Sequence, residues 1–188
     1  MGDPIRGCKL LTIQRSGVAP YYIHDPVSLS VTPDIVSGDR HEFRSASGRL
    51  VLWDEPDVMV GVELRFSQAV LDATTVRLMC GGSVSGGVYS APSITDQTSG
   101  KPLFEAVLYV SRYEAGITHE GAVKDYLKMT FPYCTGYAPG FTAVGRAFLV
   151  PEFSIYAEAD QDVLDEYGEI GEYGEGPYSF EFIASLPS

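Results

Sequence analysis

The sequence has few of the residues that build metal centres and disulfide frameworks. Among 188 residues there are three histidines and three cysteines. No histidine begins an H-E-x-x-H zinc motif, and the cysteines are widely separated and form no C-x-x-C pair: Cys8, Cys80 and Cys134. We therefore expect no metal and no cofactor, and the free cysteines favour a reducing compartment.

Motifs of common enzymes are also missing. The run Gly81–Gly87 resembles a phosphate-binding loop, but no Gly-Lys-Ser/Thr follows it, and no G-x-S-x-G nucleophile motif occurs. A group of carboxylates offers calcium-type oxygen ligands, but it lacks the glycine of an EF-hand loop, so a solvated acidic surface is favoured: Asp160, Asp162, Asp165 and Glu166. We expect that the protein is not an enzyme.

Long hydrophobic runs are absent, and basic residues are scarce. The longest uncharged stretches, 78–95 and 129–145, are broken by Gly, Ser and Pro, which excludes membrane helices there. No export or anchoring signal is expected at the N-terminus. Thirteen basic and 25 acidic residues give a net charge of -12, which disfavours binding to phosphate backbones or anionic membranes. The acidity is concentrated in the C-terminal segment 158–188.

Aromatic residues and turn formers are plentiful, with 12 Tyr, 9 Phe, 20 Gly and 12 Pro, which favours strands separated by turns. The clearest alternation runs from Val58 to Phe66, where every second residue is apolar and a half-buried strand is predicted. Other predicted strands are Lys9–Arg15, Leu50–Trp53, Leu103–Tyr113, Val123–Tyr133, Val144–Ala157 with Pro151 at an edge or bulge, and Tyr178–Ala184.

One short helix is predicted at residues 72–80, capped by Asp72 and closed by Gly81 in left-handed geometry. We predict a turn-rich stretch at 16–33, an extended hairpin or mobile loop at 34–49, and a long loop at 81–100. The predicted fold is mainly β: an antiparallel β-sandwich or barrel with one flanking helix and long loops, forming a single domain over residues 1–188.

Two predicted strands carry tyrosines among charges of both signs on their outward faces: Glu105, Tyr109 and Arg112 on one, and Lys124, Tyr126 and Lys128 on the other. Such a mixture is typical of self-complementary subunit contacts. A sugar-stacking platform is the alternative for the tyrosines. Three of these residues are our candidate inter-subunit contacts: Tyr109, Arg112 and Tyr126.

The block Val58–Gly82 (VMVGVELRFSQAVLDATTVRLMCGG), a strand that leads into a short helix ending on glycines, resembles the major tail proteins (tail tube proteins) of tailed bacteriophages. The loop 34–49 and the acidic C-terminal region are similar too. The resemblance implies a structural subunit in the virion tail, made in the host bacterial cytoplasm and joined to other phage tail proteins. It also implies hexameric rings that stack into a conduit through which DNA passes without specific binding.

The resemblance further implies that the loop 34–49 reaches a neighbouring ring. Its three arginines, Arg40, Arg44 and Arg49, are candidate partners for carboxylates on another subunit. Two alternatives remain open. The chain is also compatible with another ring-forming tail component, such as a terminator or distal tail ring, or with a carbohydrate-binding β-sandwich module.

Overall fold

The computed structural model describes residues 5–45, 48–68, 71–93, 101–114, 123–141, 150–159 and 176–187, with the backbone alone for residues 6, 40–45 and 48–54. The fold is mainly β, with antiparallel strands and one short helix in this part of the chain, which confirms the predicted fold class. Its elements are β1 (Ile5–Gln14), β2 (Tyr21–His24), β3 (Ser28–Val36), β4 (Arg40–Ser45), β5 (Gly48–Asp54), β6 (Val58–Ser67), α1 (Ala73–Cys80), β7 (Ser83–Ser85), β8 (Val88–Ser90), β9 (Phe104–Tyr113), β10 (Val123–Gly136), β11 (Glu152–Glu158) and β12 (Ser179–Ile183).

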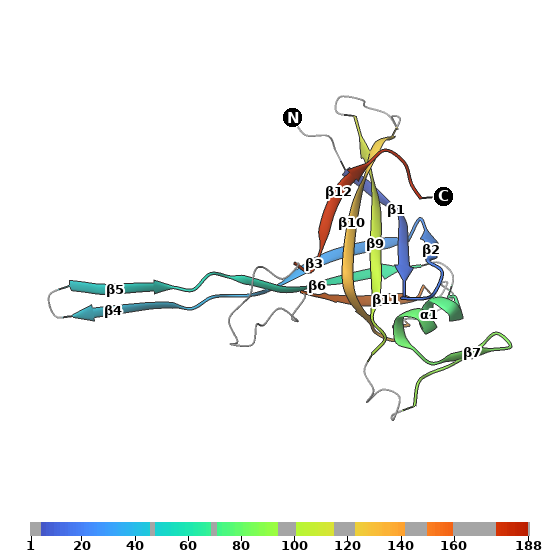
Figure 1. The fold of residues 1–188 in the computed structure, drawn as a ribbon, viewed down its shortest axis with the longest axis horizontal. Coiled ribbons are helices and arrows are strands. Elements are labelled where there is room, and N and C mark those ends of the chain that lie inside the picture. The colour runs from blue at the N-terminus through green and yellow to red at the C-terminus, as the bar shows by residue number, and fades with distance from the viewer. Residues whose placement is uncertain are drawn as a thin grey trace.

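One eight-stranded sheet forms the body. Its strand order is β2-β1-β9-β10-β11-β6-β3, and β12 also pairs with β10. In Figure 1 the antiparallel strands β1, β9, β10 and β12 stand upright, and β3, β6 and β11 lie across them. The sheet therefore folds over on itself into two crossed layers, an arrangement in which strands change layer through bends or bulges.

Strand β10 connects the two layers. Its first part pairs with β9 and β12, and its last residues, Cys134–Gly136, pair with β11. The register against β9 shifts between Phe131 and Cys134, the interval that contains Pro132. Because proline has no N–H to donate to the ladder, it is found at such irregularities, where the strand bends. Pro132 thus marks the point where β10 leaves one layer for the other.

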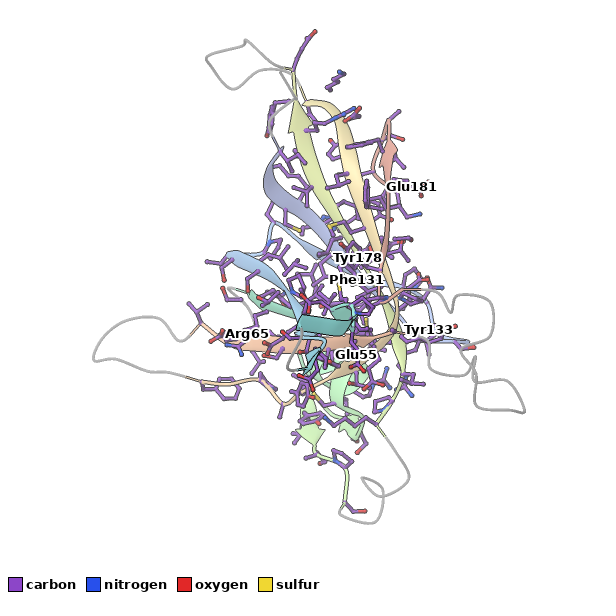
Figure 2. The ribbon with its side chains drawn as sticks, turned by 90° about the vertical axis from the view of Figure 1, so that its left-hand side faces the viewer. Glu55, Arg65, Phe131, Tyr133, Tyr178 and Glu181 are labelled. Atoms are coloured by element: carbon purple, nitrogen blue, oxygen red, sulfur yellow. The ribbon has the colours of Figure 1, made fainter. Side chains whose placement is uncertain are left out.

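The core lies between the layers. Val62, Leu64 and Phe66 of β6 are at most 1% exposed, which confirms the predicted alternation for this half of the strand, whereas Val58 at its start is 54% exposed. The Phe66 ring stacks on Phe153 of β11 at a centroid distance of 5.0 Å. The Phe131 and Tyr178 rings lie 5.8 Å apart between their centroids. Both residues are labelled in Figure 2.

Helix α1 has the predicted bounds and closes one end of the core with Val76, Leu78 and Met79. It contacts the end of β10, where a Cβ on Gly136 would lie 2.6 Å from the Met79 Cβ, so a glycine is required for this close approach. Gly81 follows with φ 78°, and its N–H donates to the Arg77 carbonyl. Asp72 occupies the predicted N-cap position, with an extended backbone at φ -109° and ψ 127°.

Three other local predictions were wrong. The turn-rich stretch contains β2 and most of β3, because β3 is an edge strand and tolerates Pro33 opposite Val62. The expected long loop after α1 holds the β7–β8 hairpin, whose turn residues Gly86 and Gly87 have φ 57° and 80°, as two-residue hairpins require. Strand β11 begins at Glu152, after Pro151, and residues 142–149 lie outside the described part.

Candidate assembly surfaces

The β4–β5 hairpin forms an arm that projects from the body. Strands β3 and β6 lead directly into it, and Figure 1 shows it extending far beyond the sheet. This confirms the extended hairpin as the correct interpretation of the loop 34–49 and lengthens it to Asp54. A two-stranded ribbon alone is at best marginally stable in water, so this arm is a segment that gains from a partner.

At the root of the arm, residues 37–39 and 55–57, the two chain segments cross in close contact. The Gly38 N–H donates to the Asp57 Oδ1 at 2.9 Å, and the Glu55 N–H donates to the Asp39 carbonyl at 3.0 Å. A Cβ on Gly38 would overlap the Glu55 carbonyl oxygen and lie 2.7 Å from that of Pro56. Glycine at position 38 therefore lets the two strands cross and fixes the direction in which the arm leaves the body.

A second set of contacts lies where the ribbon joins the body, next to the crossing at Gly38, and involves side chains of β3 and β11. The Tyr156 hydroxyl on β11 donates to the Asp34 Oδ2 on β3 at 2.7 Å. To reach it, the ring lies over Gly61 of β6, where a Cβ would be 2.6 Å from the Tyr156 Cζ. The hydrogen bond to Asp34, followed by burial, raises the pKa of Tyr156 to about 12. No short motif marks these three residues, because they meet only when β3, β6 and β11 pair.

Apolar side chains are exposed at the same root. Ile35, Val36 and Val58 are 55%, 55% and 54% exposed. Val36 pairs with Val58, and Ile35 pairs with Met59 one register position away, so the two pairs lie on opposite faces of the ribbon. The ribbon thus presents apolar surface on both faces where it leaves the body.

All three predicted arginines lie in the arm. Arg40 pairs with Asp54, whereas Arg44 pairs with Arg49 next to a register shift. Like charges at directly opposed positions destabilise an isolated ribbon. The role of these arginines as contacts with another subunit stays a prediction.

The other candidate contacts lie elsewhere, and not on one face. Tyr109 is 7% exposed and packs in a small cluster with Leu10, Val107, Ile183 and Leu186. Tyr126 pairs with Ser111 on one side and Ile183 on the other.

Arg112 lies on the opposite face of the sheet from Tyr109. It bonds bidentately to the Asp125 carboxylate, with Nε to Oδ1 at 2.6 Å, and its guanidinium lies 3.9 Å from the centre of the Phe182 ring. The predicted single outward face of tyrosines and charges does not form. The role of Tyr109, Arg112 and Tyr126 in subunit contacts stays a prediction.

Sequence reasoning missed two exposed aromatics on β12. Phe180 and Phe182 are 62% and 49% exposed, and the predicted strand at 178–184 gave no indication of this exposure. Glu181 lies between them in the sequence, so its side chain is on the opposite face of β12, where its Oε1 accepts a 2.7 Å hydrogen bond from the Lys128 Nζ. Glu181 is labelled in Figure 2. β12 pairs with the first part of β10, whereas the crossing strand β11 pairs with its last residues. Strand periodicity does not predict this position.

The cysteines have the properties of packing residues. Burial raises the pKa of the Cys134 thiol to about 12 and that of Cys8 to about 11, so both stay protonated and unreactive at neutral pH. Among the described residues, no cluster of three or more His, Cys, Asp or Glu side chains is arranged to hold a metal ion. The carboxylates considered for calcium, residues 160–166, lie outside the described part.

In the part of the chain that the structure describes, no helix has the length and apolarity needed to cross a bilayer.

No family model and no curated protein matches the sequence. Among solved structures, the chain is similar to the tube-terminating cap of the anti-feeding prophage, with TM-score 0.45, 9% identity and coverage of 97% of this chain and 94% of that chain. It is also similar to a chain of the PVC sheath/tube terminator of an extracellular contractile injection system (TM-score 0.41, 12% identity, 84% and 94% coverage) and to one of the anti-feeding prophage baseplate (0.42, 12%, 82% and 92%). At such low TM-scores these likenesses carry no argument about function.

Proposed function

We propose that the chain is a structural, non-catalytic subunit of a bacteriophage tail tube, which assembles with copies of itself into stacked hexameric rings. The observation that carries this proposal is the β4–β5 arm, a twisted two-stranded ribbon directed away from its own body. Such a ribbon cannot bury its side chains against its own fold, and it is stabilised when a second molecule covers it. The resemblance of the Val58–Gly82 block to tail tube proteins gives the kind of assembly.

The net charge supports the conduit role. With a charge of -12, each subunit repels DNA, and a lining that repels phosphates lets DNA slide through without being held. The proposal includes no DNA site, no cofactor and no membrane contact. It places the protein in the virion tail, beside other tail proteins, after synthesis in the host cytoplasm.

Excision of the arm tests the proposal. Asp39 and Glu55 are joined by a backbone hydrogen bond, so residues 40–54 can be replaced by Asn-Gly, which closes a two-residue hairpin turn. We expect the shortened protein to keep the circular dichroism spectrum and thermal unfolding of the body but to form no tubes in negative-stain microscopy. The matched control replaces residues 46 and 47, which connect β4 to β5 in the sequence, with Asn-Gly.

The full-length protein should form tubes of stacked rings under the same conditions. Isolated closed rings would favour a terminator or distal tail ring instead. A full-length protein that stays monomeric at high concentration in light scattering and binds glycans on an array would overturn the proposal in favour of a carbohydrate-binding module.

A further inference from the structure

The body carries an apolar groove beside α1. It lies between α1, the β7–β8 hairpin and residues 137–141 and has a volume of about 940 Å³. Three of its large lining side chains, Leu71, Tyr137 and Phe141, are 47%, 46% and 52% exposed. The Lys101 ammonium lies 3.6 Å from the centre of the Tyr137 ring, and Asp72 also lines the groove. The groove is thus an apolar depression that carries charges of both signs.

The arm and the groove lie on opposite sides of the molecule. In Figure 1 the arm leaves the body on the left, whereas α1 and β7 lie at the lower right. An arm therefore cannot reach the groove of its own chain. Any arm that occupies the groove comes from another copy.

The arm has a face that suits such a groove. In its register His41 pairs with Trp53 and Phe43 pairs with Val51, so these four residues occupy alternate positions on one face of the ribbon. The other positions hold the pairs Arg40–Asp54 and Glu42–Leu52, three charged residues and one apolar residue. A ribbon whose aromatic residues share one face, with three charged residues at the alternate positions, is complementary to an apolar groove that is also lined by a cation and a carboxylate.

We propose that the groove beside α1 receives the aromatic face of the β4–β5 arm of a second copy. This inference rests on the proposed function, because it names the surface through which the copies join. The contact is head-to-tail, so each copy gives one arm and accepts one. Contacts of this kind close into rings or continue as open stacks, depending on the rotation between neighbours.

A mixing experiment tests the pairing. Phe141→Glu, alone and with Leu71→Glu, places charge in the groove at half-exposed positions, and Trp53→Glu places charge on the arm. Each variant alone should need at least about tenfold more protein for assembly in sedimentation velocity, because a carboxylate must be desolvated at the contact. Val27→Glu is the matched control: Val27 is 62% exposed, does not line the groove, and its variant should assemble as the unaltered protein does.

The equimolar mixture gives the decisive result. The intact arm of the Phe141→Glu chain should enter the intact groove of the Trp53→Glu chain, and growth should stop at a heterodimer because both remaining ends are blocked. No heterodimer in the mixture would overturn the inference. So would groove variants that assemble normally while the unaltered protein forms tubes, an outcome that leaves the proposed function standing. If the unaltered protein does not assemble at all, both fall.

Crosslinking covers the case in which a charge variant fails to fold. Cys80 lines the groove, so Val51→Cys in a Cys8→Ser background offers one thiol on the arm and one in the groove. A short bismaleimide should give intermolecular adducts that map to Cys80 by peptide mass spectrometry. Assembled protein without such adducts would count against the arm-in-groove contact.

Discussion

The glycine beneath Tyr156 gives the most direct test of how the arm root is built. In Gly61→Ala, the new Cβ would lie 2.6 Å from the Tyr156 Cζ and 2.9 Å from the Ala157 carbonyl oxygen, so the ring or the strand must move. Overpacking of this kind costs about 1–3 kcal/mol. Against it stands a gain of about 0.4–1 kcal/mol, because alanine restricts the unfolded chain. We expect a net loss of about 1–2 kcal/mol in the free energy of unfolding.

Urea denaturation followed by circular dichroism measures this loss, and a double-mutant cycle identifies its source. In a Tyr156→Ala background the ring is gone and only the contact with the Ala157 carbonyl remains, so Gly61→Ala should cost less than in the unaltered protein by at least about 0.5 kcal/mol. Gly140→Ala is the matched control, since a Cβ there would meet nothing within 4 Å. Equal costs of Gly61→Ala in both backgrounds would refute the proposed packing of the ring over Gly61.

Three further predictions concern the body and the arm root. The pKa of Tyr156 is raised above its ordinary value of 10.0 to about 12, so the stability from its bond to Asp34 is complete below pH 10 and lost as pH rises through 12. Tyr156→Phe should flatten the fall in unfolding temperature between pH 10 and 12, and a parallel fall in both proteins would contradict this cause. Arg112→Ala leaves the 17% exposed Asp125 side chain without its bidentate partner and should cost about 1–3 kcal/mol in urea, with a smaller cost in an Asp125→Ala background. Phe131→Ala should cost about 3–5 kcal/mol by the same assay because this ring is fully buried, and a cost under about 1 kcal/mol would refute its place in the core.

Local signals explain which elements could be predicted. The Val58–Phe66 alternation and the glycine-closed helix at 72–80 depend on neighbours in the sequence, and both were predicted at nearly their observed bounds. The β7–β8 hairpin also had a local signal, alternating residues around Gly86-Gly87, which was read as a loop. Strand β3 had none, because Pro33 argues against a strand unless that strand is known to lie at a sheet edge.

For the candidate assembly surfaces too, the sequence predicted what depends on neighbouring residues and missed what depends on strand pairing. The sequence placed Arg40, Arg44 and Arg49 together in one segment, an extended hairpin or mobile loop, because they are close in the chain and accompanied by glycines. It did not show that Tyr156 reaches Asp34 across Gly61, since 122 residues separate the two bonded side chains. It also grouped Tyr109 with Arg112, although the sheet places them on opposite faces.

The sequence by itself determined the β-rich class, the short helix and the acidic character, because each depends on composition or on periodicity over a few residues. For residues 34–49 it left an extended hairpin and a mobile loop open. The tertiary structure decided which strands lie at edges, where β10 crosses between layers at Pro132, and on which side of the body the arm and the groove lie. Those properties depend on pairings between distant segments. Their register is set by how the whole sheet closes around its core, and no local stretch of the chain contains that information.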